Sequence, residues 1–349
     1  MTIDRQFCLD MAAAHRKSTT AQNKAHAAAY EALAARLAPV VPPVVVPPVV
    51  VPPAVSGRPF AAGSPFNTPT PATTTWRDES VLHTVPNGWD AALPAGTRVK
   101  PWVTTALPFY RAAPTDPIWT FDMGATNDPY MNRVRPAERI AMRAPATLAA
   151  WHPDDAVVIA IDGTKYVEVW NAIVDPVTRT VRSGNPARNN GWIGWAKGDV
   201  ATGLGCMSVP NDGTRAANFS RLAGAITADD IARGRIDHAL VIELPAYLLN
   251  AAPSGTVKWV PPATAYDNGW ARGPILSGAR IGIPAGVAKP ALSGEASMLW
   301  DCLQTYGMFV GDFCGGPWPI FYVADGLNPN PWYLSAGIAT VWDALRVAV

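Results

Sequence analysis

Residues 156–174 read AVVIAIDGTKYVEVWNAIV, and this stretch decides the expected fold class. Two runs rich in β-branched and aromatic residues, 156–162 and 165–174, flank the turn-forming pair Asp162-Gly163. From Lys165 onward, polar and apolar residues alternate as they do along a strand of a sheet. The stretch therefore predicts two β-strands separated by a tight turn.

The same pattern recurs toward the C-terminus. Further strands are predicted at 238–244, 257–260, 279–283, 308–312 and 319–323, and helices at 228–233, 295–306 and 338–347. With 35 prolines and 28 glycines, the chain is interrupted too often for long helices in this part. We therefore expect a mainly β body, a β-sandwich or jelly roll with one or two packed helices.

Toward the N-terminus the regular pattern is lost. Residues 59–155 are rich in Pro, Thr and Trp, and we expect an irregular segment that crosses the face of the sandwich. Residues 39–55 read PVVPPVVVPPVVVPPAV. Each proline fixes its own φ and keeps the preceding residue out of the helical region, which predicts a polyproline II strut at about 3.1 Å per residue. The alternative is an ordinary interdomain linker.

The first 38 residues are predicted to form a helix. They contain the run AQNKAHAAAYEALAARLA (21–38), made of strong helix formers, and two short apolar stripes separated by a polar middle. Such a narrow helix gains burial from other chains, so we expect an anchor that assembles with copies of itself, as a trimer, or docks on a larger assembly. A frayed helix leaning on its own body is the alternative. The expected domains are 1–38 (anchor), 39–58 (linker) and 59–349 (β head).

Composition excludes several classes of function. The net charge is +1 without a basic block, which argues against nucleic-acid binding by phosphate neutralisation. The sequence contains no run of 18 apolar residues, so no membrane-spanning helix is predicted. Charges within the first ten residues argue against a signal peptide. The four cysteines have no CxxC spacing, so we expect neither a metal site nor a disulfide scaffold, and no cofactor motif is present. Cys302 and Cys314 are near enough in sequence to pair, but buried thiols are favoured.

Aromatic residues suggest a candidate binding site. Along 165–171, Tyr166, Glu168 and Trp170 share one face, expected to be exposed, where rings could stack on a sugar and the carboxylate could accept hydroxyl hydrogen bonds. Trp192 and Trp195 could extend this surface. The alternative is that these residues are covered by 59–155 and form a second core layer, because fourteen tryptophans cannot all bind ligand.

The string GRIDHAL (234–240) supplies candidate catalytic residues. If a strand begins at Asp237, His238 points into the core with Leu240, and it could act with Asp237 or Glu168 as an acid–base pair. A core histidine hydrogen-bonded to the backbone is the alternative, and Arg235 could simply pair with Asp237. Five carboxylates could in principle serve glycoside hydrolysis as a pair: Asp162, Glu168, Asp237, Asp301 and Asp312.

Four strings in order carry a resemblance to a known family: SPFNTP (64–69), IDGTKYVEVW (161–170), GRIDHAL (234–240) and LWDCLQTYGMFVGDF (299–313). Together they resemble a family of secreted actinobacterial proteins with a β-sandwich body, whose related modules occur in tail proteins of phages of those hosts. The resemblance implies a carbohydrate-related role and no particular catalytic residues. This chain has a helix and a strut in place of an export signal, which suggests re-use of the body as a virion part.

We therefore expect a phage minor tail or fibre-type protein, assembled into the virion. Residues 1–38 would contact other tail proteins, and the head would bind a glycan of the host cell envelope. One alternative is a glycan-cleaving enzyme, a glycoside hydrolase or lyase acting on the host cell wall. The other is a purely structural decoration protein, and a secreted location is the alternative to the virion.

Overall fold

The computed structural model describes thirteen stretches of the chain: residues 58–78, 82–85, 96–99, 102–107, 109–128, 133–150, 156–183, 194–206, 213–250, 259–267, 273–314, 318–324 and 336–349. The predicted anchor helix and nearly all of the predicted linker therefore lie outside the described residues. The chain separates into two units, 1–51 with 84–98, and 52–83 with 99–349. In the first unit, Thr84 and Arg98 form an antiparallel bridge. Every helix and strand named below belongs to the second unit.

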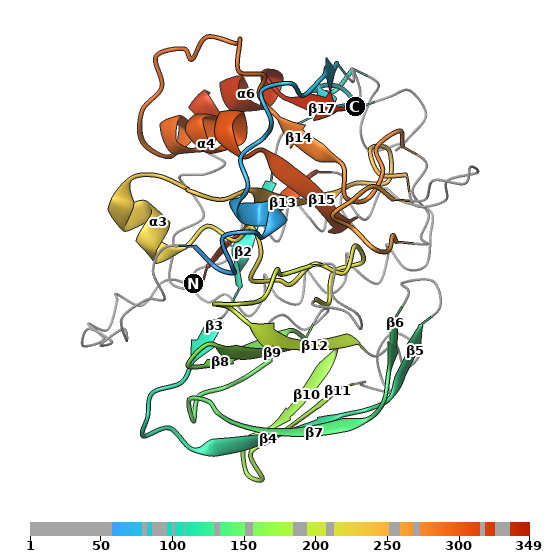
Figure 1. The fold of residues 1–349 in the computed structure, drawn as a ribbon, viewed down its shortest axis with the longest axis vertical. Helices are drawn as coiled ribbons and strands as arrows, with labels where there is room; N and C mark the ends of the chain where they lie inside the picture. The colour runs from blue at the N-terminus through green and yellow to red at the C-terminus, as the bar shows by residue number, and fades with distance from the viewer. Residues whose placement is uncertain are drawn as a thin grey trace, which may run out of the picture. The chain divides into compact units, whose positions relative to one another are not determined.

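Two four-stranded sheets form a β-sandwich (Figure 1). The outer sheet has the order β10 (Ala172–Asp175), β11 (Thr180–Ser183), β4 (Ile118–Met123) and β7 (Glu138–Arg143). The inner sheet has the order β12 (Gly194–Asp199), β9 (Lys165–Trp170), β8 (Val158–Asp162) and β3 (Phe109–Arg111). Apolar residues of both sheets fill the space between them, among them Trp119, Phe121, Val167, Val169 and Trp195. A two-stranded ribbon, β5 (Thr126–Asp128) and β6 (Arg133–Arg135), completes this part of the fold.

A seven-stranded mixed sheet forms the other half of the unit. Its order is β1 (Trp76–Arg77), β17 (Arg346–Ala348), β14 (Arg280–Gly282), β15 (Met308–Phe313), β13 (Leu240–Leu244), β16 (Ile320–Ala324) and β2 (Trp102–Leu107). The central pair β13 and β15 is parallel. Helices α4 (Gly294–Thr305) and α6 (Ala336–Asp343) pack on one face of this sheet, with Leu299, Ile338 and Trp342 against Leu240 and Met308.

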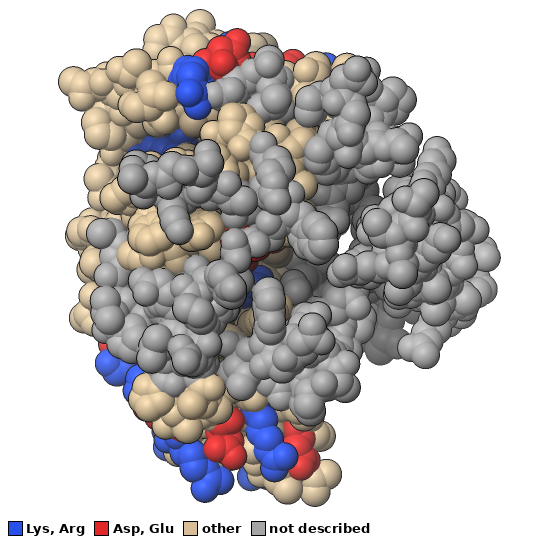
Figure 2. Space-filling model, turned by 90° about the vertical axis from the view of Figure 1, so that its right-hand side faces the viewer, with Lys and Arg blue, Asp and Glu red and all other residues tan. Residues whose placement is uncertain are grey.

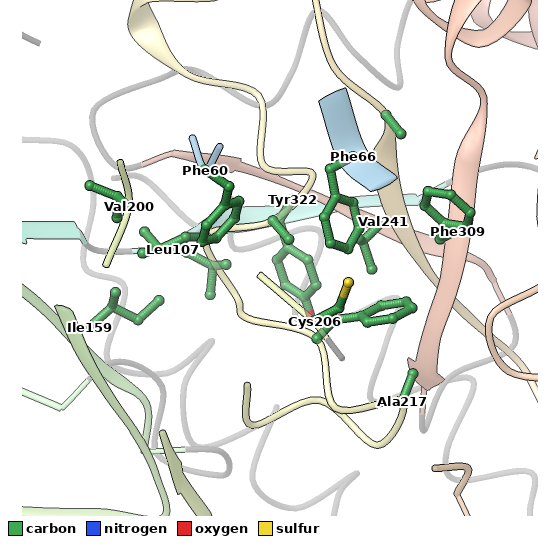
Figure 3. Close-up of a cluster of buried hydrophobic side chains, with 14 of the residues drawn as sticks. Phe60, Phe66, Leu107, Ile159, Val200, Cys206, Ala217, Val241, Phe309 and Tyr322 are labelled. Carbon is green, nitrogen blue, oxygen red and sulfur yellow. The ribbon is translucent and has the colours of Figure 1, made fainter. Parts of the chain in front are cut away.

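The other face of the seven-stranded sheet contributes to a large aromatic core (Figure 3). Phe66 lies in the short 3-10 turn η1 (Pro65–Asn67) and packs edge-on against Phe219 at 5.3 Å and Phe309 at 5.5 Å. The same core contains Ile159 and Tyr166 of the inner sandwich sheet. The inner sheet is therefore buried on both faces, by the outer sheet on one side and by this core on the other.

The mainly β fold with a few packed helices is confirmed, and no barrel is closed within the described residues. The helix expected at 228–233 is α3 (Ala228–Arg233), which begins with a capping box between Thr227 and Asp230 and ends at Gly234 in the left-handed region, φ 66°. The helix expected at 295–306 is α4. The strand expected at 165–174 is divided into β9 and β10 at Asn171, which has φ 59°.

Two expectations about the fold are wrong. The helix expected at 338–347 is α6, which ends at Asp343, and residues 346–348 form strand β17 instead. The stretch 59–155 is not an irregular wrapping segment, because it contributes strands β1 to β7 to all of the sheets. Strands β2, β4 and β7 have six residues each, as β9 has, but prolines lie close to them in sequence and led to the expectation of an irregular segment. Only its beginning behaves as expected: residues 58–67 cross the large core, where Phe60 and Phe66 are buried.

Candidate functional sites: a buried charged cluster and an open cleft

The predicted aromatic platform on β9 is not exposed. The alternation is correct, since Val167 and Val169 face the outer sheet, but the opposite face is covered too. Tyr166 is 2% exposed and meets the ring of Phe60 edge-on at 6.3 Å, and Glu168 is fully buried. The face of β9 that carries Tyr166 and Glu168 is therefore part of a second core layer, which was the alternative prediction.

The tryptophans do not complete a platform either. Trp170 is half-buried and packs against the large core. Trp195 is buried in the other core, inside the sandwich, where its indole N–H donates to the carbonyl of Gly124 at 3.1 Å. Trp192 lies outside the described residues. Tyr166 and Trp195 therefore belong to opposite faces of one sheet and cannot hold the same ligand.

Glu168 instead connects a buried loop segment, residues 213–224, to the inner sheet through hydrogen bonds. Its Oε1 accepts a hydrogen bond from the amide of Thr214 at 2.5 Å, and its Oε2 accepts from the Ser220 hydroxyl at 2.9 Å and the Arg221 amide at 2.8 Å. Burial raises the pKa of Glu168, although these donors and the charge of Arg221 oppose the rise. With both oxygens engaged by the segment, Glu168 is a structural acceptor rather than a catalytic group.

The same segment is fastened to the seven-stranded sheet by charged residues. Arg215 is fully buried; it donates to the carbonyl oxygens of Ser220 at 2.6 Å and Ala223 at 3.2 Å, and its Nε lies 3.7 Å from Oε1 of Glu243. The amide of Ala216 donates to Asp312 at 3.1 Å. These contacts, together with those of Glu168, define the buried charged cluster: Glu168, Arg215, Arg221 and Glu243, which are buried, with the half-buried Asp312 at its border.

A β-bulge places the two carboxylates of this cluster side by side. Between β13 and β15 the register passes from Ile242–Val310 to Glu243–Asp312, which leaves Gly311 as the extra residue. A Cβ atom at Gly311 would lie 2.5 Å from Val241 and 3.1 Å from Arg215, so a larger residue here would collide with Val241 and press against the arginine. Burial and the charge of Asp312 raise the pKa of Glu243 to about 7.

Sequence reasoning did not select Arg215, Arg221 or Glu243. The available signal was Glu243 itself, a carboxylate in the apolar run LVIEL of a central strand. Of the five carboxylates considered for hydrolysis, the structure brings only Glu168 and Asp312 to this segment. Asp301 pairs with Lys289 at 2.6 Å on the exposed side of α4.

The GRIDHAL string forms a separate buried group. His238 is fully buried as expected, although β13 begins two residues later, at Leu240. Its Nε2 lies 3.4 Å from Asp230 and its Nδ1 3.1 Å from the carbonyl of Ala239. The neighbouring Asp237 pairs with Arg235 at 2.9 Å, as predicted.

The nearby thiol does not complete a nucleophilic triad with this pair. Cys302 donates to the backbone carbonyl of His238 at 3.2 Å, not to its ring. Burial raises the pKa of the Cys302 thiol, which is the opposite of what activates a nucleophilic cysteine. Burial would raise the pKa of Asp230, but hydrogen bonds from His238 and Thr227 outweigh burial and lower it. Asp230 and His238 therefore form a structural pair whose contact joins α3 to the residues just before β13.

An open cleft of about 520 Å³ is lined by residues of β7 of the outer sheet and of β8, β9 and β12 of the inner sheet. Its walls carry Asp162, Lys165, Lys197 and Asp199, with Tyr166 and apolar residues of β7 between them. Figure 2 shows basic and acidic side chains gathered at the lower end, the end occupied by the sandwich strands in Figure 1. The described part of the chain thus has a hollow with a charged lining on the sandwich.

Ion pairs hold the charged groups of the cleft in place. Lys165 Nζ donates to Asp199 Oδ2 at 2.8 Å, and Lys197 donates to Glu138. Asp199 also accepts from the amides of Ala201 and Thr202, and the hydrogen bond from Lys165 lowers its pKa well below the usual range. Gly198 leaves room for the Tyr166 ring, because a Cβ atom at position 198 would lie 2.7 Å from the tyrosine hydroxyl.

The described residues contain no group of three His, Cys, Asp or Glu side chains placed to hold a metal ion. The described cysteines, Cys206, Cys302 and Cys314, are buried thiols. No helix among the described residues is long and apolar enough to cross a membrane. Comparison with protein families, curated proteins and solved structures found no match to this chain. Function must therefore be argued from the sites themselves.

Proposed function

We propose that the chain is a virion protein, a phage minor tail or fibre-type protein whose β body binds a glycan of the host cell envelope in the cleft between β7, β9 and β12. The observation that carries the binding role is the cleft of about 520 Å³ with its fixed charged lining. Ligand sites in proteins fall in this range of volume and combine an apolar surface with a few placed polar groups.

The lining suits a ligand rich in hydroxyl groups. Asp199 is kept ionised by Lys165 and two backbone amides, so it can accept hydrogen bonds from sugar hydroxyls, while Lys165 and Lys197 can donate to them. Ile140 and Ala141 of β7, which are not buried, supply apolar surface for the C–H face of a ring. Each carboxylate is balanced by a nearby cation, which favours a neutral ligand over a strongly charged one.

Binding is preferred to catalysis because the three candidate catalytic residues are occupied otherwise. Glu168 holds the segment 213–224, His238 is enclosed with Asp230, and Asp237 is paired with Arg235. The roles proposed for 1–38, docking to other tail proteins and trimer formation, rest on the helix and strut predicted from sequence and on the family resemblance. Several heads on one particle would turn weak sugar contacts into useful avidity.

A second candidate is the purely structural decoration protein. The burial of Tyr166 and Trp195 favours it, because the aromatic residues that suggested a binding surface are core residues. It predicts that the cleft binds no glycan.

The two candidates are separated by binding of the purified protein to purified actinobacterial cell wall and its soluble oligosaccharides, measured by sedimentation and calorimetry. We expect the double variant Lys165→Ala/Lys197→Ala to bind at least tenfold more weakly, since each lost hydrogen bond to a charged group is worth about 1.5–3 kcal/mol. Lys289→Ala is the matched control, because Lys289 pairs with Asp301 on α4 and does not line the cleft. Wall binding unchanged in the double variant, or absent in the unaltered protein, would favour the decoration protein.

A further inference from the structure

Residues 59–67 follow the expected linker directly, and we call this segment the strap. The amide of Phe60 donates to the carbonyl oxygen of Val200 at 2.5 Å, and the amide of Ala61 donates to that of Gly203 at 2.9 Å. The strap is therefore bonded through its backbone to the turn that follows strand β12.

The turn that the strap contacts also holds the acidic residue of the cleft. The carboxylate of Asp199 accepts hydrogen bonds from the amides of Ala201 and Thr202, at 2.8 and 3.1 Å, and its carbonyl oxygen accepts from the amide of Gly203 at 2.8 Å. The turn 199–203 thus presents amides to Asp199 and carbonyl oxygens to the strap.

The Phe60 side chain supports a second part of the cleft lining. Phe60 is 5% exposed, and its ring meets that of Tyr166, which lines the cleft, edge-on at 6.3 Å. Figure 3 shows the Phe60 ring beside Val200 in the large core. Gly205 leaves room for this ring, because a Cβ atom at position 205 would lie 2.6 Å from it. One short segment therefore contacts both Tyr166 and the turn that holds Asp199.

The strap has an unusual conformation that Asn67 maintains. Phe60 has φ 77°, a region that residues other than glycine adopt only where the surrounding structure holds them. The side-chain amide of Asn67 donates to the carbonyl oxygens of Pro59, Phe60 and Ala61, at 3.0, 3.1 and 3.0 Å. Asn67 is 5% exposed, so these hydrogen bonds are shielded from water. Loss of this side chain should therefore release the first half of the strap.

We propose that the strap controls the affinity of the cleft. With the strap in place, Tyr166 and the turn 199–203 have the positions that bind ligand, and release of the strap loosens the turn and weakens binding. The contacts from Phe60 and Ala61 to the turn are direct, so the two segments form one continuous network. Coupling between two sites is reciprocal, and a ligand in the cleft therefore holds the strap more tightly. The effect on binding rests on the proposed function, whereas the coupling of strap and turn rests on the fold alone.

Amide hydrogen exchange of the full chain tests the coupling without any ligand. In Asn67→Ala, which changes no residue of the cleft, we expect the protection of Ala201, Thr202 and Gly203 to fall by about tenfold or more. Unchanged protection of these three amides would overturn the proposal.

Two controls separate this local effect from a general loss of stability. Phe121 and Ile140 pair in the outer sheet, and their protection should not change in Asn67→Ala. Gln304→Ala is the matched variant, because the Gln304 side-chain amide also donates to backbone carbonyl oxygens, those of Pro284 and Val287. Gln304→Ala should leave the protection of the turn 199–203 as it is in the unaltered protein.

Exchange of the unaltered protein in low concentrations of denaturant decides the question even if Asn67→Ala folds poorly. The amides of Phe60 and Ala61 should open together with those of the turn 199–203, with one common free energy of opening. A turn that stays protected after the strap amides have opened would overturn the coupling.

Soluble cell-wall oligosaccharides test the effect on binding. We expect Asn67→Ala to bind about tenfold more weakly in calorimetry, and saturating ligand to raise the protection of Phe60 and Ala61 in the unaltered protein by a similar factor. A strap with a merely structural role would not respond to ligand.

The outcomes for the cleft and for the strap can be told apart. Equal affinity of Asn67→Ala and the unaltered protein, or no response of the strap amides to bound ligand, would overturn control by the strap. If the unaltered protein binds no oligosaccharide, the proposed function fails, and control of binding fails with it. The exchange results without ligand then still support or overturn the coupling of the strap to the turn 199–203.

Discussion

Replacing Glu168 by Gln tests whether this residue is the structural acceptor described above. Gln is nearly the same size, but its amide group would meet the donor of Thr214 with another donor, while its oxygen could still accept from Ser220 and Arg221. A buried donor left unpaired costs about 1–3 kcal/mol, and hydrogen bonds to a charged acceptor exceed those to a neutral one by about 1 kcal/mol each. We therefore expect a loss of about 3–5 kcal/mol in the free energy of unfolding.

The loss can be measured by urea unfolding followed by tryptophan fluorescence and near-ultraviolet circular dichroism. A loss of about 4 kcal/mol should lower the melting temperature by about 8 °C in a domain of this size. Glu138→Gln is the matched control, because the Glu138 side chain is 34% exposed and pairs with Lys197. Surface ion pairs contribute about 0–1 kcal/mol, so this control should be nearly neutral. If the free energy of unfolding of Glu168→Gln lay within about 1 kcal/mol of that of the unaltered protein, the structural role of Glu168 would be refuted.

The remaining predictions concern packing, acid sensitivity and domain organisation. Tyr166→Ala should cost about 3–5 kcal/mol in urea unfolding, whereas Tyr166→Phe should cost much less, and equal small losses would contradict burial of this ring. His238→Ala should reduce stability by removing a partner of Asp230. Because the pKa of Asp230 is lowered, its contribution is present above the unfolded pKa of about 4 and lost as the pH falls further, so acid unfolding should shift to higher pH in this variant. Deletion of residues 1–38 should leave a folded, monomeric head with unchanged near-ultraviolet dichroism, and loss of folding would contradict the predicted domain boundary.

Local elements could be predicted because their signals are local. The turn pair Asp162-Gly163 between β-branched runs specifies β8 and β9. The run from Thr227 to Gly234 has both a capping box and a C-terminal glycine, and it forms α3 as expected. The strands of 59–155 were not predicted because they lie among prolines, although β2, β4 and β7 are as long as β9. Pairing with strands that are distant in sequence stabilises them in the folded chain.

The candidate site could not be predicted in the same way. Strand alternation assigned Tyr166 and Glu168 correctly to one face, but a period of two does not say whether that face meets water or another part of the chain. The covering groups are Phe60 and the segment 213–224, which are distant in sequence. Because Phe60 packs on Tyr166 and the segment 213–224 binds Glu168, the face predicted to bind sugar is instead part of the core.

The sequence by itself determined the mainly β class, most strands after residue 156, the short helices and the burial of His238, because these depend on backbone preferences and side-chain periodicity within a few residues. Only the tertiary structure decided what the charged residues do. Arg215, Glu243 and Asp312 interact because a bulge at Gly311 and a buried loop bring three separate stretches together. The pKa of a carboxyl group depends on the charges and the burial around it, and those are set by the packing of the whole unit.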